Sequence, residues 1–206
     1  GVFMAVDFRD EAPAILKDYL IYKQTIKNMS KKTVDEYFID LRTFFRFLKV
    51  MRGLVPDGTE FDEIKIDDVD LDLIKTVNLE LAYDYMNFLY RDRNNKSASR
   101  ARKCSSLKGF FKYITNNKHL LDTNPVEQLE SPKNKKALPK YLTLEQSIEL
   151  LNVVDGNNKQ RDYCILTLFL NCGLRVSEMA GLNYNDIHSD GTMRILSLIH
   201  ISEPTR

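Results

Sequence analysis

The sequence SKKTVDEYFIDLRTFFRFL, residues 30–48, decides the fold class, because it carries a strong amphipathic helical signal. Its apolar residues recur at the i, i+3, i+4, i+7 spacing that places side chains on one face of a helix. They are Val34, Tyr37, Phe38, Leu41, Phe44, Phe45 and Leu48. Ser30 is a candidate N-cap, and Gly53 and Pro56 end the helix. We interpret the aromatic stripe as core packing, which favours a helical domain.

Further helices are predicted on both sides of this stretch. Apolar periodicity and breaking residues place them over residues 12–26, 78–91, 97–116, 143–151 and 161–171. Ser97 or Ser99 is expected to cap the helix over 97–116. Thr143 and Gln146 predict a capping box at the start of the next helix.

Two segments between these helices have other signatures. Residues 57–72 carry eight acidic side chains against one lysine, which predicts a solvated loop or a short helical turn. A β-strand is expected over residues 193–199, directly after the Asp190-Gly191 turn. The sequence therefore predicts a mainly α protein with a short β element near its C-terminal end.

Composition excludes several classes of protein. The chain has 206 residues, 43% of them hydrophobic, which is enough for one large or two small cores. Cys104, Cys164 and Cys172 form no CxxC pair, so a reducing cytoplasm fits better than a disulfide framework or a zinc site. No apolar run approaches the roughly 18 residues of a membrane span. We expect a cytoplasmic protein with no metal, cofactor or membrane contact.

Positive charge is concentrated between Arg100 and Lys140, although the net charge of the chain is only +1. This region holds ten basic and three acidic residues, an excess of seven. Exposed amides at a helix start, hydroxyls and arginines together can bind phosphate. The candidate nucleic-acid contacts are Ser30, Lys31, Thr33, Ser97, Ser99, Arg100, Arg102, Lys103, Ser106, Lys133, Lys135 and Lys136. A solvated surface is the alternative; two such helix starts plus a basic linker favour nucleic acid.

The stretch NCGLRVSE, residues 171–178, joins two predicted helices. An apolar helix ends at Gly173, and a second short helix carries Arg175 and Glu178 at i, i+3 spacing. We expect the Arg175 stem to be buried between its apolar neighbours, and Cys172 to be a small buried packing residue. An arginine in a first helical turn needs an anion, either Glu178 or a phosphate brought by a partner. Most pairs at this spacing are structural, so the residues alone do not favour catalysis.

The longer stretch NCGLRVSEMAGL, residues 171–182, resembles the catalytic-arginine motif of tyrosine recombinases of the phage-integrase and Xer type. Residues 30–48, 97–114, 124–125 and 132–139 are similar to the helical core-binding domain and linker of that family. The resemblance covers residues 12–195. It implies a SAM-like helical core-binding domain, followed by the first helices and a short β element of an α+β catalytic domain.

The resemblance also implies domain boundaries. Residues 1–129 would form the core-binding domain, 130–140 a basic linker, and 141–195 the first part of the catalytic domain. Residues 196–206 resemble a translated sequencing-adapter tail and are expected to be non-native. The family's lysine, His-x-x-Arg motif and nucleophilic tyrosine cannot be placed; His200 is followed three residues later by Glu203 rather than by arginine.

In this family a tyrosine attacks a DNA phosphodiester and forms a 3′-phosphotyrosyl link, with no metal or cofactor. The resemblance implies that Arg175 is catalytic and binds the non-bridging oxygens of the phosphate, with Glu178 as its support. It further implies a C-shaped clamp around double-stranded DNA and a tetramer of the full-length protein. We expect this chain to be a monomeric fragment that binds DNA without cleaving it. The alternatives are a non-enzymatic helical DNA-binding or adaptor protein, and a helical interaction module without nucleic acid.

Overall fold

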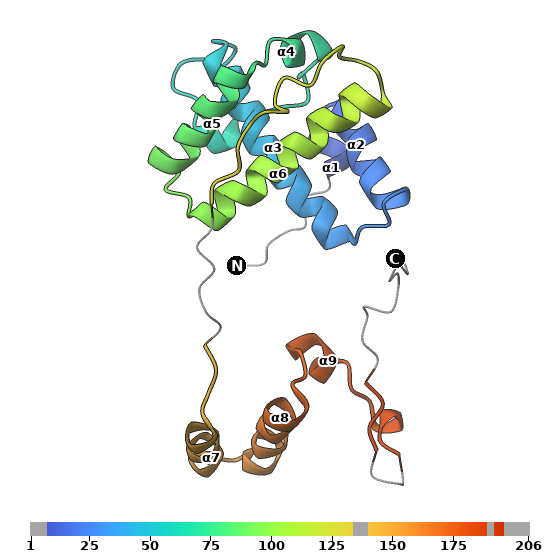
Figure 1. Cartoon of the computed structure of the whole chain (residues 1–206), viewed down its shortest axis with the longest axis vertical. Helices are drawn as coiled ribbons and strands as arrows, with labels where there is room; N and C mark the ends of the chain where they lie inside the picture. The colour runs from blue at the N-terminus through green and yellow to red at the C-terminus, as the bar shows by residue number, and fades with distance from the viewer. Residues whose placement is uncertain (1–7, 134–139, 189–191, 196–206) are drawn as a thin grey trace. The chain divides into compact units, whose positions relative to one another are not determined.

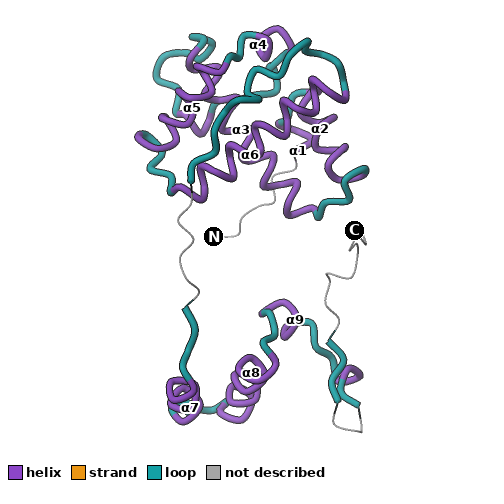
Figure 2. Tube along the Cα trace, in the orientation of Figure 1, coloured by secondary structure: helices purple, strands orange, loops and turns teal. Residues whose placement is uncertain are grey.

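The computed structural model describes residues 8–133, 140–188 and 192–195. It divides the chain into two compact units, residues 1–136 and 137–206 (Figure 1). Helices and loops make up the described residues (Figure 2). The prediction of a mainly α protein is confirmed. The expected tail, residues 196–206, lies outside the described residues.

The first unit is built around helix α3, Lys31–Met51, which packs between α2, Ala14–Thr25, and α6, Ser97–Lys112 (Figure 1). The predicted apolar stripe of α3 is buried at every position except Tyr37, which is half-buried. Phe44 and Phe45 contact rings from α5 and α6 at centroid distances between 5.1 and 6.1 Å. Burying these aromatic rings stabilises the unit. The core-packing interpretation is therefore confirmed.

The remaining elements of the first unit surround these three helices. They are α1 (Phe8–Glu11), a 3₁₀ turn (Phe61–Glu63), α4 (Leu71–Lys75), α5 (Leu79–Arg91) and a π-helical turn (Tyr113–Asn117) that extends α6. Ser30 caps α3 as predicted, because its hydroxyl accepts a hydrogen bond from the Thr33 amide at 3.3 Å. The predicted Ser97 or Ser99 cap is wrong. The N-cap of α6 is Lys96, which makes no capping side-chain bond, and the helix starts at Ser97.

The acidic segment, residues 57–72, is only partly solvated. Its apolar residues Ile64, Ile66 and Val69 are buried. Lys49 of α3 donates to the backbone oxygen of Lys65 at 2.9 Å and to Asp68 at 2.7 Å, so it ties the segment to the domain. The prediction of a short helical turn is confirmed by the 3₁₀ turn Phe61–Glu63, and the segment also contributes to the core.

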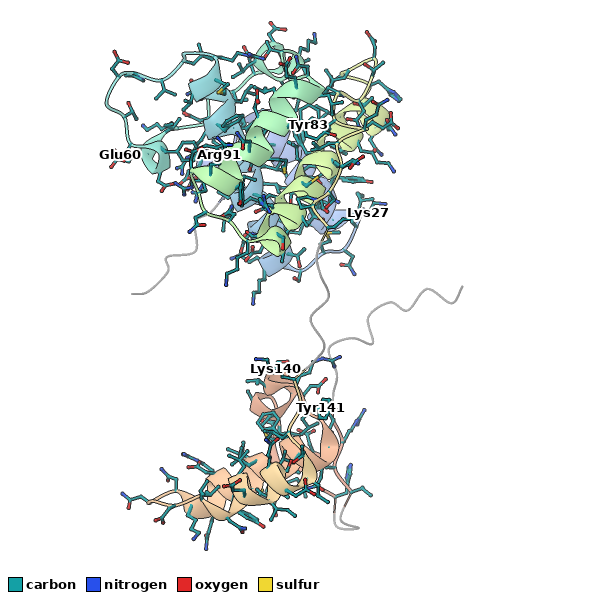
Figure 3. The ribbon with its side chains drawn as sticks, turned by 60° about the vertical axis from the view of Figure 1, so that its left-hand side comes forward. Lys27, Glu60, Tyr83, Arg91, Lys140 and Tyr141 are labelled. Carbon is teal, nitrogen blue, oxygen red and sulfur yellow. The ribbon has the colours of Figure 1, made fainter. Side chains whose placement is uncertain are left out.

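The second unit contains α7, Leu144–Asn152, and α8, Lys159–Cys172, which pack against each other. Thr143 and Gln146 form the predicted capping box at the start of α7. Just before this helix, Lys140 and Tyr141 extend into solvent (Figure 3). The Thr143 capping box marks the residue at which the helical part of this unit begins.

A short helix, α9 (Val176–Ala180), and a 3₁₀ turn (Tyr184–Asp186) complete the described part of the second unit. Met193 forms an isolated antiparallel bridge with Ile187. The bridge agrees with a β element after the turn, but residues 196–199 of the predicted strand lie outside the described residues. Among the described helices of both units, none is both long and apolar enough to cross a membrane.

Candidate nucleic-acid interface

The basic start of α6 is organised around one buried carboxylate, that of Asp40 on α3. Lys103 Nζ donates to Asp40 Oδ1 at 2.9 Å. Ser106 Oγ donates to Asp40 Oδ2 at 2.7 Å, and Arg102 Nη1 lies 2.9 Å from the same oxygen. Burying a charge is costly unless it is paired and hydrogen-bonded, and here both conditions are met. Three of the predicted DNA contacts therefore converge on one residue of the protein.

Lys103 and Ser106 are only 9% and 3% exposed, so the structure places them inside the domain. Their donors are directed to Asp40, which corrects our interpretation of these two residues as phosphate contacts. The sequence did contain a signal for this arrangement. Asp40 lies four residues before Phe44 and seven before Phe47, on the buried side of α3. An acid at such a position needs a cation from a neighbouring element.

The cluster formed by Asp40, Arg102, Lys103 and Ser106 also contacts α5. The Tyr85 hydroxyl, buried in the core, donates to the backbone oxygen of Asp40 at 3.5 Å. Burial, and then the nearby Asp40 charge, raises the pKa of the Tyr85 phenol well above its usual range. The cluster thus joins α3, α5 and α6 at one point.

Two arginines of α6 are not fully buried: Arg102 is exposed and Arg100 is half-buried. The Arg102 side chain is 44% exposed and also pairs with Glu36 of α3. The Arg100 guanidinium stacks over the Tyr90 ring, 4.6 Å from its centroid. Ser97 and Ser99 are half-buried in the first turn of α6, near its free amides. This helix start combines positive charge with hydrogen-bond donors at the surface.

The start of α3 lies at the same edge of the unit as the start of α6 (Figures 1 and 3). Ser30 and Thr33 are exposed, and their hydroxyl oxygens are 3.0 Å apart. Lys31 is exposed beside them. Both predicted helix starts therefore lie along this edge of the unit. Lys133 is exposed, and Lys135 and Lys136 lie outside the described residues.

In the second unit, Gly173 ends α8 in the left-handed conformation, with φ of +62°. This is the predicted helix end, since glycine adopts positive φ without a Cβ clash. Arg175 follows as the N-cap of α9, with extended backbone, rather than lying in the first turn. Leu174, between them, is the only buried apolar side chain in the described part of this unit.

The Glu178 carboxylate binds both the backbone amide and the guanidinium of Arg175. Glu178 Oε2 accepts from the Arg175 amide at 2.8 Å, and Oε1 accepts from Arg175 Nη1 at 2.9 Å. The Arg175 side chain is 65% exposed, whereas that of Glu178 is 12% exposed. The expected burial of the arginine stem is therefore wrong, and so is that of Cys172, which is exposed. An exposed guanidinium with one nitrogen engaged keeps donors for an anion.

The described residues contain no group of three or more histidine, cysteine, aspartate or glutamate side chains that could hold a metal ion. The site consists of arginines, lysines and hydroxyls around helix starts. Such donors suit the oxygen atoms of phosphate groups.

The model of the phage integrase N-terminal SAM-like domain matches residues 16–118. The model of the phage integrase family matches residues 140–203. The chain belongs to the phage integrase family. The second match runs past Ile195, into residues expected to be a non-native tail; the origin of that tail stays a prediction.

The chain is similar to several curated tyrosine recombinases. It is 49% identical over 178 residues to a protein named tyrosine recombinase XerC from Caldanaerobacter subterraneus subsp. tengcongensis, covering 86% of this chain and 50% of that relative. It is 32% identical to the XerC of Syntrophus aciditrophicus over 88% of this chain and 55% of the relative. A tyrosine recombinase of Pseudothermotoga lettingae is 31% identical over 84% of this chain and 53% of the relative. The chain thus spans about half the length of these relatives. No solved structure matches it.

Proposed function

We propose that this chain is the DNA-binding and arginine-bearing part of a tyrosine recombinase that carries out site-specific DNA recombination. The observation that carries the proposal is the exposed Arg175, held by two bonds to Glu178 within the part of the chain that matches the family. The relatives named tyrosine recombinase, which align over most of the chain, support it.

In this proposal Arg175 donates hydrogen bonds to the non-bridging oxygens of the phosphate that is cleaved. Negative charge grows on these oxygens as a nucleophile adds, so a fixed planar donor stabilises the transition state more than the ground state. Glu178 orients the guanidinium by fixing Nη1 and the backbone amide. The family resemblance implies that the nucleophile is a tyrosine. The bond it forms to phosphorus conserves the energy of the phosphodiester, so no cofactor is required.

The first unit would bind double-stranded DNA through the edge at which α3 and α6 start. The proposed contacts are Ser30, Lys31, Thr33, Ser97, Ser99, Arg100 and Arg102, with Lys133, Lys135 and Lys136 following in the linker. These groups contact the phosphate backbone, which positions a protein on DNA without reading its sequence. We further propose residues 1–129, 130–140 and 141–195 as core-binding domain, linker and start of the catalytic domain. In this proposal the chain is a cytoplasmic monomer, and the whole recombinase is a tetramer on DNA.

Binding is tested by fluorescence anisotropy of the 206-residue chain with a labelled duplex of about 30 base pairs. Affinity is expected to fall steeply between about 50 and 200 mM salt, because bound lysines and arginines release counterions from the phosphates. An affinity independent of salt would contradict a phosphate-binding edge. The chain alone is expected to form no covalent product with a nicked duplex.

Activity is tested in a chimera in which residues 12–195 replace the corresponding part of the Caldanaerobacter relative. The chimera is expected to form a covalent protein–DNA product, and Arg175→Ala to slow this step about 10²–10³-fold, as loss of a transition-state donor does in other enzymes. A folded chimera that binds DNA but never cleaves it would instead favour a non-enzymatic DNA-binding or adaptor protein.

A further inference from the structure

Arg102 contacts two carboxylates of different character. Asp40 is buried, and its oxygen lies 2.9 Å from Arg102 Nη1. Glu36 contacts the same nitrogen, but its side chain is 48% exposed. The Arg102 side chain itself remains 44% exposed. The guanidinium is therefore held at one nitrogen, on the protein side, and its other donors can be approached from solvent.

Asp40 does not need Arg102 for neutralisation. Lys103 supplies one full positive charge at 2.9 Å, and the Ser106 hydroxyl donates to the second oxygen at 2.7 Å. These two bonds satisfy the buried carboxylate and fix its orientation. The contact with Arg102 is an additional ion pair between the buried carboxylate and a side chain that is 44% exposed.

We propose that Asp40 is a positioning residue for DNA binding, which sets the Arg102 guanidinium on the edge of the first unit that meets the phosphate backbone. This inference rests on the proposed function. Lys103 and Ser106 act on Asp40 rather than on DNA: they orient the carboxylate that in turn orients Arg102. The physical effect is preorganisation, because a long arginine side chain otherwise loses its rotamer freedom when it binds a phosphate.

A carboxylate next to a phosphate-binding arginine also has an opposite effect, since its negative charge repels DNA. The two effects give opposite signs when the charge of Asp40 is removed. If Asp40 positions Arg102, Asp40→Asn weakens DNA binding although the protein becomes more positive. If Asp40 only contributes charge, the same substitution strengthens binding. The sign of the change therefore separates positioning from simple electrostatics.

The experiment compares the full chain and its Asp40→Asn variant by anisotropy with the same duplex of about 30 base pairs, over a range of salt concentrations. The expected result is about tenfold weaker binding and a salt dependence lower by about one phosphate contact. Glu36→Gln is the matched control, because it removes the same charge from the same arginine without touching a buried group. It is expected to bind DNA as tightly as the wild type or more tightly.

Asp40→Asn leaves the buried Lys103 without its ion pair, so this variant can fail to fold. Asp40→Asn/Lys103→Met removes both buried charges and leaves Arg102 without its ion pair to residue 40. If circular dichroism shows this variant folded, its DNA affinity decides the question. Arg102→Ala is then added, and it is expected to cause no further loss of affinity in either Asp40 variant.

Folded Asp40 variants that bind as tightly as the wild type, with an unchanged salt dependence, would overturn the positioning role while leaving the proposed function intact. A wild-type chain that shows no salt-dependent binding would instead overturn the proposed function, and this inference with it.

Discussion

Glu178 bonds to Arg175 twice, accepting from its amide at 2.8 Å and from its guanidinium at 2.9 Å. The first bond is a helix cap, and the second orients the side chain. These two roles require different chemistry, because the cap needs only an acceptor oxygen whereas the ion pair needs a charge. Substitutions at Glu178 can therefore separate them.

Glu178→Ala removes both bonds and is expected to speed amide exchange over residues 175–178, measured by hydrogen–deuterium exchange. The lost cap corresponds to about 0.5–2 kcal/mol of local stability. Glu178→Gln retains an acceptor and is expected to behave nearly as the wild type, since an ion pair that solvent reaches from the exposed Arg175 side contributes about 1 kcal/mol or less. Equal exchange in the Gln and Ala variants would show that the charge, and not the cap, maintains the turn.

The Lys49–Asp68 pair is asymmetric, because the Lys49 side chain is 8% exposed and that of Asp68 is 63% exposed. Asp68→Ala leaves a buried ammonium with only the Lys65 oxygen as acceptor and is expected to lower the free energy of unfolding by about 1–3 kcal/mol. Lys49→Met leaves an exposed carboxylate that water can solvate, so its effect is expected to be below about 1 kcal/mol. Urea denaturation measures both. A larger loss for Lys49→Met would contradict this order.

Gly109 of α6 allows a close approach to α2. A Cβ added at Gly109 would lie 2.7 Å from the Tyr19 hydroxyl oxygen, which is held in the core by the rings of Phe110 and Tyr113. Gly109→Ala is expected to destabilise the domain by about 1–3 kcal/mol, although alanine is the better helix former. Adding Tyr19→Phe removes the clashing atom, and the next ring atom is 3.9 Å away. The double variant is expected to recover most of the loss in thermal unfolding; additive effects would rule out this contact as the cause.

The Tyr19 hydroxyl is buried and has no hydrogen-bond partner among the described residues. Burial raises its pKa, and that of Tyr85, above the ordinary value of about 10. The folded protein therefore keeps tyrosine protons that the unfolded chain loses at high pH. The contribution of the two tyrosines to the free energy of unfolding is present below about pH 10 and is lost as the pH rises above it. Tyr19→Phe is expected to raise stability by about 1 kcal/mol at neutral pH and to reduce alkaline sensitivity.

Lys23 changes the pH dependence of folding stability in the opposite direction, because burial, and then the Lys27 charge, lowers its pKa. Alkaline unfolding of Tyr19→Phe is therefore compared with that of the wild type at matched pH, with Tyr85→Phe as a second tyrosine variant. An unchanged alkaline midpoint in both variants would show that buried tyrosines do not cause the alkaline loss.

Arg100 and Lys103, three residues apart on α6, are expected to respond differently to substitution. Arg100→Ala removes a half-buried cation over Tyr90 and is expected to weaken DNA binding and lower its salt dependence by about one contact. Lys103→Met removes the main cation of a buried carboxylate and is expected to lower thermal stability first, by about 1–3 kcal/mol. Anisotropy and thermal unfolding of both variants test this division. A Lys103→Met variant with the thermal stability of the wild type would contradict it.

The local features of this chain were predicted from sequence because their causes are local. The apolar spacing of residues 34–48, the Ser30 and Thr143 caps, and the helix end at Gly173 depend on neighbours within a few residues. The family resemblance of residues 171–182 depends equally on a contiguous pattern. These signals determined the helical fold class and the assignment of Arg175 and Glu178 as a pair.

Tertiary structure decided which charged residues face solvent. Arg100, Arg102, Lys103 and Ser106 form one basic, serine-containing stretch in sequence, but the crossing of α3 over α6 places Asp40 against only some of them. The same packing draws the acidic segment onto Lys49 and buries its apolar residues. The partners of the buried Asp40 carboxylate are the donors that packing brings within hydrogen-bond distance of it. Lys103 and Ser106 lie 63 and 66 positions away from Asp40 in the sequence. That selection exists only once the helices have packed, because the spacing in α3 marks Asp40 as a buried acid but does not specify which cation of another helix meets it.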